Sequence, residues 1–313
     1  MIKDLLKQRI LILDGAMGTL IQSYDLTEND YRGRAFDTHS TDLKGNHDIL
    51  SLTRPDIIRN IHQRYIAAGA DIITTNTFNA NAISQAEFMC EEFVYELNLS
   101  GVQLAKESAL KSGRKLFVAG SIGTTSQPLS FNNSQIDFDA FSTAFQPQVR
   151  GLIDGGVDLF LVETVFDGLN AKTILSVIAD IQKEKKIETP IIISVTIDNQ
   201  TGNTFVGQSL FDIYSAISDY SILGFGVNCS FGSADLYPLM EQLSEKLPCY
   251  LCIYPNAGLP NKEGIYSDSP EQMANRFKPV AEKKLVNIVG GCCGTTPEHI
   301  RCIKKMVENI YTQ

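Results

Sequence analysis

The sequence has no tryptophan, only four histidines and eleven prolines, and fewer basic than acidic side chains. Its 27 Lys and Arg residues against 36 Asp and Glu give a net charge of −9. Nucleic-acid binding needs clustered basic side chains, so this balance argues against that class and favours a small-molecule partner. The chain also has no Pro/Ser-rich or low-complexity segment, and its 43% hydrophobic content excludes a disordered or fibrous protein.

Long hydrophobic runs are absent too. The longest apolar stretch near the N-terminus, Ile10 to Leu13, is too short for the core of a signal peptide, and no run approaches the roughly 20 residues that span a bilayer. Without a secretion signal, the seven cysteines are expected to be free, metal-bound or buried rather than disulfide-bonded. We therefore expect a cytoplasmic protein without membrane contact.

Eight short apolar segments recur along the chain, with amphipathic helical patterns between them. The expected strands are residues 10–14, 71–75, 116–120, 159–163, 191–195, 225–229, 250–254 and 286–290. Most are continuously apolar, as strands covered on both faces are. Eight strand-then-helix units without a linker predict an α/β fold, a (β/α)8 TIM barrel, with residues 1–313 forming one domain. An open doubly wound sheet is the alternative, but residues 15–18 lack the glycine-rich phosphate loop typical of it.

Two helices have ends that can be located from the sequence. One opens at the phrase Thr-Arg-Pro-Asp, residues 53–56, and ends at Gly69, and the last begins at Pro297 behind a capping Thr296. A barrel of this class carries its active site at the C-terminal ends of the strands. Three long loops, at residues 15–53, 121–136 and 255–267, are expected on that face, as parts of the site or as surface decoration.

Two adjacent cysteines, Cys292 and Cys293, follow the eighth expected strand and have glycines on both sides. Neighbouring side chains in a strand point to opposite faces, so both thiols can meet one metal only where the backbone leaves strand geometry. Cys229 ends the sixth expected strand and is predicted to converge with them. Three thiolates with one free position are typical of a catalytic zinc site. Small core residues, or a redox-active pair formed by Cys292 and Cys293, are the alternatives.

The other cysteines and the histidines are not expected to carry chemistry. Cys249 and Cys252 bracket an apolar strand and face opposite sides, which makes chelation by this CxxC unfavourable. Cys90 and Cys302 are expected to pack in helical segments. No histidine follows an expected strand, and His62 and His299 are expected within helices, either packed or exposed.

Two carboxylates end strands on the expected catalytic face, Asp14 after the first and Glu163 after the fourth. A carboxylate there is costly unless it is paired, so we expect either a clamp for a substrate ammonium or an internal hydrogen-bond network. Weaker candidates of the same kind are Asn76, Asn228 and Ser121. The turn at residues 15–19 could present backbone N–H groups to an anion.

Six phrases spread over the chain resemble the homocysteine-binding module of cobalamin-dependent methionine synthase, within the wider homocysteine S-methyltransferase family. They are residues 13–19 (LDGAMGT), 43–48 (LKGNHD), 70–78 (ADIITTNTF), 162–167 (VETVFD), 254–260 (YPNAGLP) and 290–297 (GGCCGTTP). The paired cysteines are shared across the family, whereas PNAGLP and LKGN look specific to methionine synthase. The residues at 123–125, Gly-Thr-Thr, depart from that pattern, which has a proline after the glycine.

The resemblance implies zinc held by Cys229, Cys292 and Cys293, with the sulfur of L-homocysteine entering the open position. It also implies that the amino-acid part is bound by Asp14, by Glu163 and by the backbone at Gly15, Ala16 and Met17. Asn228 is a further substrate-binding candidate, from its place near the end of the sixth expected strand. The expected reaction is methyl transfer from a methylcobalamin carrier to give L-methionine, with no catalytic group beyond the zinc-bound thiolate. A cysteine-rich zinc site should keep this sulfur nucleophilic at neutral pH, where a free thiol is mostly protonated.

Such methionine synthases carry further folate-binding, cobalamin-binding and reactivation modules, which do not fit in 313 residues. We therefore expect the folate and cobalamin modules to act in cis or in trans. An alternative is a stand-alone homocysteine methyltransferase that takes its methyl group from S-methylmethionine or betaine. A non-enzymatic alternative is a zinc-dependent or thiol-based redox sensor.

Overall fold

The computed structural model describes residues 2–311, apart from 126–128, 131–135 and 233–235. Eight parallel strands form one sheet in the order β1-β8-β7-β6-β5-β4-β3-β2, and a bridge between Leu13 and Ile72 brings its two ends together. This confirms the predicted (β/α)8 barrel. The strands are β1 (Leu11–Ile12), β2 (Ile72–Thr74), β3 (Phe117–Gly123), β4 (Leu159–Val165), β5 (Ile191–Val195), β6 (Gly224–Gly232), β7 (Tyr250–Asn256) and β8 (Ile288–Val289).

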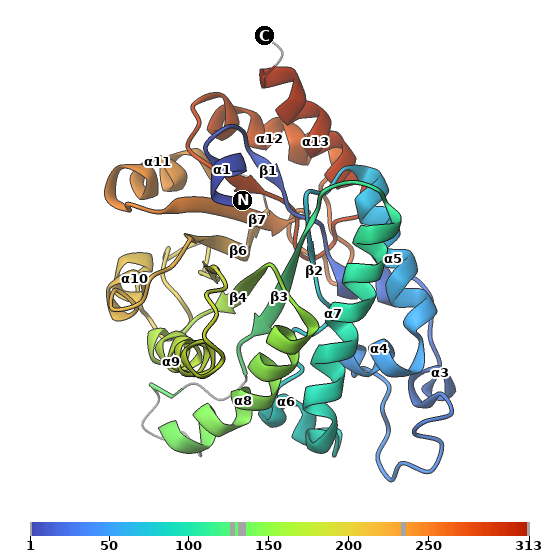
Figure 1. Cartoon of the computed structure of the whole chain (residues 1–313). Helices are drawn as coiled ribbons and strands as arrows, with labels where there is room; N and C mark the ends of the chain where they lie inside the picture. The colour runs from blue at the N-terminus through green and yellow to red at the C-terminus, as the bar shows by residue number, and fades with distance from the viewer. Residues whose placement is uncertain (1, 126–128, 131–135, 233–235, 312–313) are drawn as a thin grey trace.

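Helices surround the barrel on its outside, and shorter ones decorate the connections after β1 and β2 (Figure 1). The long outer helices are α5 (Pro55–Ala68), α7 (Val94–Lys111), α8 (Phe138–Gly155), α9 (Gly168–Lys185), α10 (Leu210–Ala216), α11 (Leu236–Lys246), α12 (Pro270–Glu282) and α13 (Pro297–Tyr311). Those shorter helices are α2 (Met17–Gln22), α3 (Glu28–Arg32), η1 (His47–Ile49), α4 (Leu50–Thr53), α6 (Ala82–Ala86) and η2 (Glu91–Phe93), and one more short helix, α1 (Ile2–Leu6), precedes β1.

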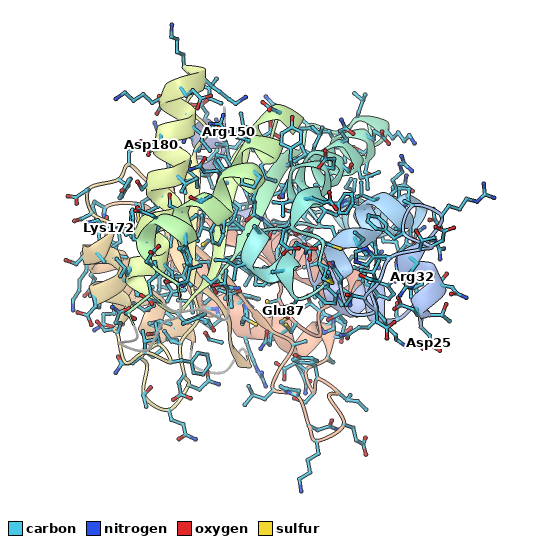
Figure 2. All side chains as sticks on the ribbon, turned by 90° about the horizontal axis from the view of Figure 1, so that it is seen from below. Asp25, Arg32, Glu87, Arg150, Lys172 and Asp180 are labelled. Carbon is cyan, nitrogen blue, oxygen red and sulfur yellow. The ribbon has the colours of Figure 1, made fainter. Side chains whose placement is uncertain are left out.

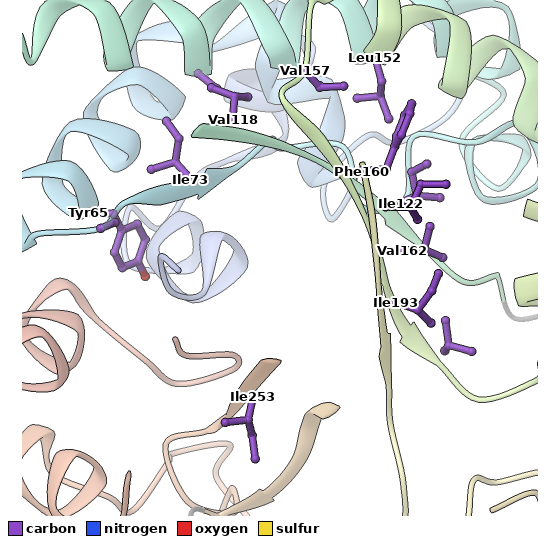
Figure 3. Packing of buried hydrophobic residues seen from close by; sticks show 14 of the residues in the cluster. Tyr65, Ile73, Val118, Ile122, Leu152, Val157, Phe160, Val162, Ile193 and Ile253 are labelled. Atoms are coloured by element: carbon purple, nitrogen blue, oxygen red, sulfur yellow. The ribbon is translucent and has the colours of Figure 1, made fainter. Parts of the chain in front are cut away.

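Alternate side chains of each strand enter two separate hydrophobic layers. On β4, Phe160 and Val162 pack outward against the helices, whereas Leu159 and Leu161 fill the barrel interior. The outward layer is visible in Figure 3, where Val118, Ile122, Phe160, Val162 and Ile193 point away from the barrel axis. Burial on both faces explains why the strands read as continuous apolar runs.

Charged side chains gather on the outside of the helices. Figure 2 shows Arg150 on α8 and both Lys172 and Asp180 on α9 directed away from the barrel. Arg150 pairs there with Glu184, with 2.6 Å between Nη2 and Oε2. Within the described residues, no helix is both long enough and apolar enough to cross a membrane.

The predicted helix ends at Gly69 and Pro297 are confirmed. Gly69 takes a left-handed φ of 107° after α5, and α13 begins at Pro297. The hydroxyl of the expected cap, Thr296, lies 2.9 Å from Nδ1 of His299. That histidine is buried, and so is His62 on α5.

The long connections are more structured than a plain loop. Residues 15–53 fold into α2, α3, η1 and α4, and Leu43 and Leu50 from this segment are fully buried. The segment 255–267 contains an antiparallel bridge between Pro260 and Tyr266. The predicted loop 121–136 begins inside β3, and part of it lies outside the described residues.

Candidate active site

A cavity of about 440 Å³ opens at the C-terminal end of the barrel, where the sequence predicted the site. The three predicted cysteines and both predicted carboxylates line it. No Lys or Arg is found among its lining residues, all of which belong to the described part of the chain. They are Leu13 to Thr19, His47, Asp48, Thr74 to Asn79, Ser121, Glu163, Thr164, Cys229, Tyr254 and Gly291 to Cys293.

The three thiols form one cluster. The sulfurs of Cys229, Cys292 and Cys293 all lie within 4.8 Å of one another, and those of Cys229 and Cys293 are 3.6 Å apart. The three cysteines could therefore hold a metal ion. By contrast, Cys252 faces the barrel interior and Cys249 faces the helices, as expected from their spacing.

The adjacent cysteines converge because the chain leaves strand geometry before it reaches them. Strand β8 ends at Val289, and Gly294 then takes a left-handed φ of 79°. A Cβ atom on Gly294 would lie 2.2 Å from the ring of Tyr266, so this position excludes any side chain. Cys292 donates its N–H to Pro255 at 2.8 Å, and Cys293 accepts from the N–H of Ala257 at 2.9 Å.

Cys229 itself has a strained backbone. Its φ is 54°, a conformation unusual for a side chain other than glycine, asparagine or aspartate and costing on the order of 1–3 kcal/mol. The pairing of β6 with β7 shifts register just after Asn228, so Cys229 stands at a bulge. The amide of Asn256 donates to the carbonyl of Cys229 at 3.0 Å and helps to hold this bulge.

The three thiols change one another's pKa through hydrogen bonds. Hydrogen bonds from Cys229 and Cys292 lower the pKa of Cys293 to about 3. Hydrogen bonds with the other two thiols, together with burial, raise the pKa of Cys292. A bond with Cys292 lowers the pKa of Cys229, but its bond with Cys293 and burial outweigh it and raise that pKa to about 12. One thiol ionises readily, and its negative charge then opposes ionisation of the other two. Three thiolates can therefore coexist here only with a cation among them.

Asp14 and Glu163 are buried and hydrogen-bonded at the cavity wall. Asp14 accepts from the N–H of Thr74 at 2.8 Å and from its hydroxyl at 3.1 Å, yet burial raises the pKa of Asp14 well above its usual range. Glu163 accepts from the hydroxyl of Ser121 at 2.5 Å. Burial raises the pKa of Glu163 to about 7, although the Ser121 and Tyr254 hydroxyls oppose the rise.

A third buried carboxyl, Asp48, lines the same cavity and was not predicted as a site residue. It accepts from the N–H of Asn79 at 3.1 Å, and burial raises the pKa of Asp48 to about 7. The sequence did point to Asp48, because it ends the phrase 43–48, one of the six that carry the resemblance. It was not chosen because it lies in the expected loop 15–53 and not at the end of an expected strand. Next to it, burial lowers the pKa of His47, which favours a neutral ring.

The predicted backbone site at Gly15, Ala16 and Met17 lies in the cavity wall. The N–H of Ala16 is already committed to the hydroxyl of Thr295 at 3.1 Å. A Cβ atom on Gly15 would come within 2.7 Å of that same hydroxyl oxygen, so the close approach of the two loops requires glycine here. Met17 begins α2, where backbone N–H groups have no partner within the helix.

The weaker candidates have mainly structural contacts. Asn76 lines the cavity, but its amide donates to the carbonyl of His47 at 2.8 Å. Asn228 is fully buried and is not among the lining residues. Its amide instead contacts Thr164, Ser194 and Cys292.

Comparisons with known proteins agree with this geometry. A family model, Homocysteine S-methyltransferase, matches residues 11–307. The metallated form of the homocysteine methyltransferase MmuM from Escherichia coli is 23% identical, with a TM-score of 0.74 over 97% of this chain and 98% of that one. Its oxidized form is 22% identical, with a TM-score of 0.73 over 95% of both chains. A B12-independent methionine synthase from Shewanella sp. W3-18-1 is 11% identical, with a TM-score of 0.51 over 86% and 90%.

The fold and the cavity define a (β/α)8 barrel that gathers three thiols and three buried carboxyls at its catalytic face. The match over nearly the whole chain adds the identity. The chain belongs to the homocysteine S-methyltransferase family and is a methyltransferase. Homocysteine as the methyl acceptor is consistent with that family.

Proposed function

We propose that the chain binds L-homocysteine at a zinc ion held by Cys229, Cys292 and Cys293, and methylates its sulfur to give L-methionine. The observation that carries the proposal is the placement of three clustered thiols and two buried carboxyls around one cavity. The thiols can hold a zinc ion that binds the substrate sulfur, and the carboxyls can bind the substrate ammonium.

The donor set fits zinc. A tetrahedral zinc ion with bonds of about 2.3 Å to sulfur separates its sulfurs by about 3.8 Å, close to the 3.6 Å between Cys229 and Cys293. Asn256, beside Cys229, has a buried Oδ1 without a hydrogen-bond partner in the described part of the chain, which fits a site that another group completes. When bound, zinc would act as a Lewis acid that stabilises the thiolate form of homocysteine near neutral pH.

The carboxyls are suited to the ammonium of the amino acid. Asp14 and Glu163 lie in a cavity without a lining Lys or Arg, so a substrate cation is their natural counter-charge. The backbone at Gly15 and Met17 is proposed to face the substrate carboxylate, and Ala16 shapes the turn through its bond to Thr295.

The chemistry needs no general base at the methyl group. The homocysteine sulfur attacks the methyl carbon in line, the new carbon–sulfur bond forms as the bond from that carbon to the donor breaks, and the donor keeps the electron pair. The thiol proton leaves when homocysteine binds. The protein's own residues orient the two ends of the substrate and exclude competing protonation of its sulfur.

The methyl donor is proposed to be methylcobalamin on a carrier module, with folate-binding and cobalamin-binding modules in cis or in trans and the cytoplasm as the compartment. The segments 43–46 (LKGN) and 255–260 (PNAGLP) support this choice over S-methylmethionine or betaine, because among the six phrases these two look specific to methionine synthase. Asp48 and Tyr254, which lie close to these two segments in the chain, line the cavity. A redox-sensing role is a second candidate, favoured only by the 3.6 Å contact between two sulfurs.

A donor assay tests the proposal. The purified, zinc-loaded chain is incubated with L-homocysteine and either methylcobalamin, S-methylmethionine or betaine, and methionine is quantified, with Cys229→Ala as the inactive control. Methionine formed from methylcobalamin alone supports the proposal. Methionine from S-methylmethionine or betaine reassigns the donor, and none from any donor, together with a reversible Cys229–Cys293 disulfide, favours redox sensing.

A further inference from the structure

Strand β4 directs two consecutive side chains into the cavity, against the usual alternation. On β4, Val162 and Val165 both pack in the outer layer, whereas Glu163 and Thr164 between them line the cavity. The pairing of β4 with β5 shifts register between Val162 and Val165, and Thr164 has a φ of 58°. This bulge is therefore what brings Thr164 to the same side as Glu163.

Thr164 is an unfavourable residue for that conformation, because a β-branched side chain crowds its backbone when φ is positive. All three of its polar groups are held. Asn228 accepts from its N–H at 3.0 Å and donates to its hydroxyl at 2.9 Å, and Thr124 donates to its carbonyl at 3.0 Å.

The same Asn228 amide extends to other elements. Its Oδ1 also accepts from the hydroxyl of Ser194 at 2.8 Å, and its Nδ2 lies 3.9 Å from the sulfur of Cys292. Asn228 belongs to β6, Thr164 to β4, and Cys292 follows β8. Because β4 and β8 each lie two places from β6 in the barrel order, the Asn228 side chain can reach both residues only through the barrel interior. Asn228 directly precedes Cys229, the other strained residue of the site.

We propose that Asn228 is a positioning residue that locks the strained bulge at Thr164 and so sets the Glu163 carboxyl relative to the thiol cluster. Its side chain is fully buried and does not line the cavity, so it acts through Thr164 and Cys292. The functional part of this inference rests on the proposed binding of homocysteine between the carboxyls and the thiols.

The test is a rescue experiment. Asn228→Ala removes the two hydrogen bonds that hold Thr164. Thr164→Gly removes the backbone strain that those bonds offset, since glycine adopts a φ near 58° without strain. Homocysteine affinity is measured by calorimetry, metal content by elemental analysis and the midpoint of thermal unfolding by circular dichroism. Asn98→Ala is the matched control: Asn98 is equally buried, on α7, and bonds to the carbonyls of Ala80 and Val94.

We expect Asn228→Ala to weaken homocysteine binding about tenfold or more, the loss typical of a buried hydrogen-bonded group. Asn98→Ala should lower only the thermal midpoint. Adding Thr164→Gly to Asn228→Ala should recover much of the lost affinity and thermal midpoint. If Asn228→Ala does not fold, Asn228→Asp, which can still accept from Thr164, takes its place and is compared with and without Thr164→Gly.

Two results would overturn the inference. One is unchanged homocysteine affinity in Asn228→Ala. The other is an absence of rescue by Thr164→Gly, which would show that Asn228 acts on the substrate or the sulfur directly. If the wild-type chain itself does not bind homocysteine, the proposed function fails, while the thermal midpoints of the same four proteins still decide whether Asn228 holds Thr164.

Discussion

The sulfurs of Cys229 and Cys293 lie 3.6 Å apart, although 64 positions separate these residues in the chain. Neither residue is in regular strand geometry. Cys229 stands at a bulge with a φ of 54°, and Cys293 follows the end of β8 and precedes a left-handed Gly294. The thiol cluster thus depends on two local departures from the barrel's regular strands.

The ligand assignment predicts that Cys229→Ala, Cys292→Ala and Cys293→Ala each lose the metal while the barrel stays folded. Two thiolates hold zinc far less well than three, and the cluster lies at the mouth of the barrel, where only Cys292 packs against the inner hydrophobic layer. Metal content after desalting and the circular dichroism spectrum report the two effects. Cys302→Ala, a partly buried cysteine on α13, is the control and should keep its zinc. Zinc retained at the wild-type level in Cys229→Ala would refute the assignment.

The turn after Cys293 predicts a large effect of Gly294→Ala. The added methyl group would meet the Tyr266 ring as well as strain the backbone, so we expect a loss of about 2 kcal/mol or more in unfolding free energy together with weaker zinc binding. Gly264→Ala is the matched control. Gly264 has nearly the same φ, 78°, but its Cβ would meet nothing within 4 Å, so a cost of only about 1 kcal/mol is expected. Equal costs in the two variants would contradict this interpretation.

Substrate recognition by Asp14 predicts that Asp14→Asn lowers homocysteine affinity about tenfold to a hundredfold, because the charge-assisted contact to the ammonium is lost. Zinc content should not change. Thr74→Val removes one of the two bonds that Thr74 donates to Asp14 and should have a smaller effect in the same direction. Isothermal titration with L-homocysteine measures both variants, and wild-type affinity in Asp14→Asn would exclude this role.

Asp48 predicts a pH dependence of stability. Burial raises its pKa from 3.8 to about 7, so between these values the folded chain keeps a proton that the unfolded chain has lost. The contribution of Asp48 to the free energy of unfolding therefore falls by up to about 4 kcal/mol as pH rises from about 4 to about 7. Above about pH 7 this contribution stays constant. Asp48→Asn removes the penalty, so its stability advantage over wild type should grow across that window in urea unfolding. A pH-independent difference would show that Asp48 is ionised in the folded chain throughout.

The strands could be predicted from the sequence because their apolar runs are covered on both faces. All eight are found, and most boundaries agree within two residues. Residues 230–232 of β6 were missed, because the chain passes through the bulge at Cys229 before it pairs again with β7. Threonine and cysteine have no preference for positive φ, so no sequence pattern announces a bulge at Thr164 or Cys229.

The candidate site could be predicted where a residue stands at or just beyond the end of an expected strand, as Asp14, Glu163 and the three cysteines do. Asp48 could not, since it belongs to η1 and reaches the cavity through the folding of residues 15–53. Asn228 does not line the cavity, because its side chain is directed to Thr164 instead. The spacing of residues along a strand does not specify this side-chain orientation. The single domain over residues 1–313 and the cytoplasmic location stay predictions.

The central claim is activation of homocysteine at a three-cysteine zinc site, and one titration tests it most directly. The chain is purified without added metal, its zinc is quantified, and L-homocysteine is added in weak buffer near neutral pH while proton release is followed. The account predicts about one zinc per chain and about one proton released per homocysteine bound, with neither in Cys229→Ala. Fully reduced cysteines without zinc, or binding without proton release, would contradict it.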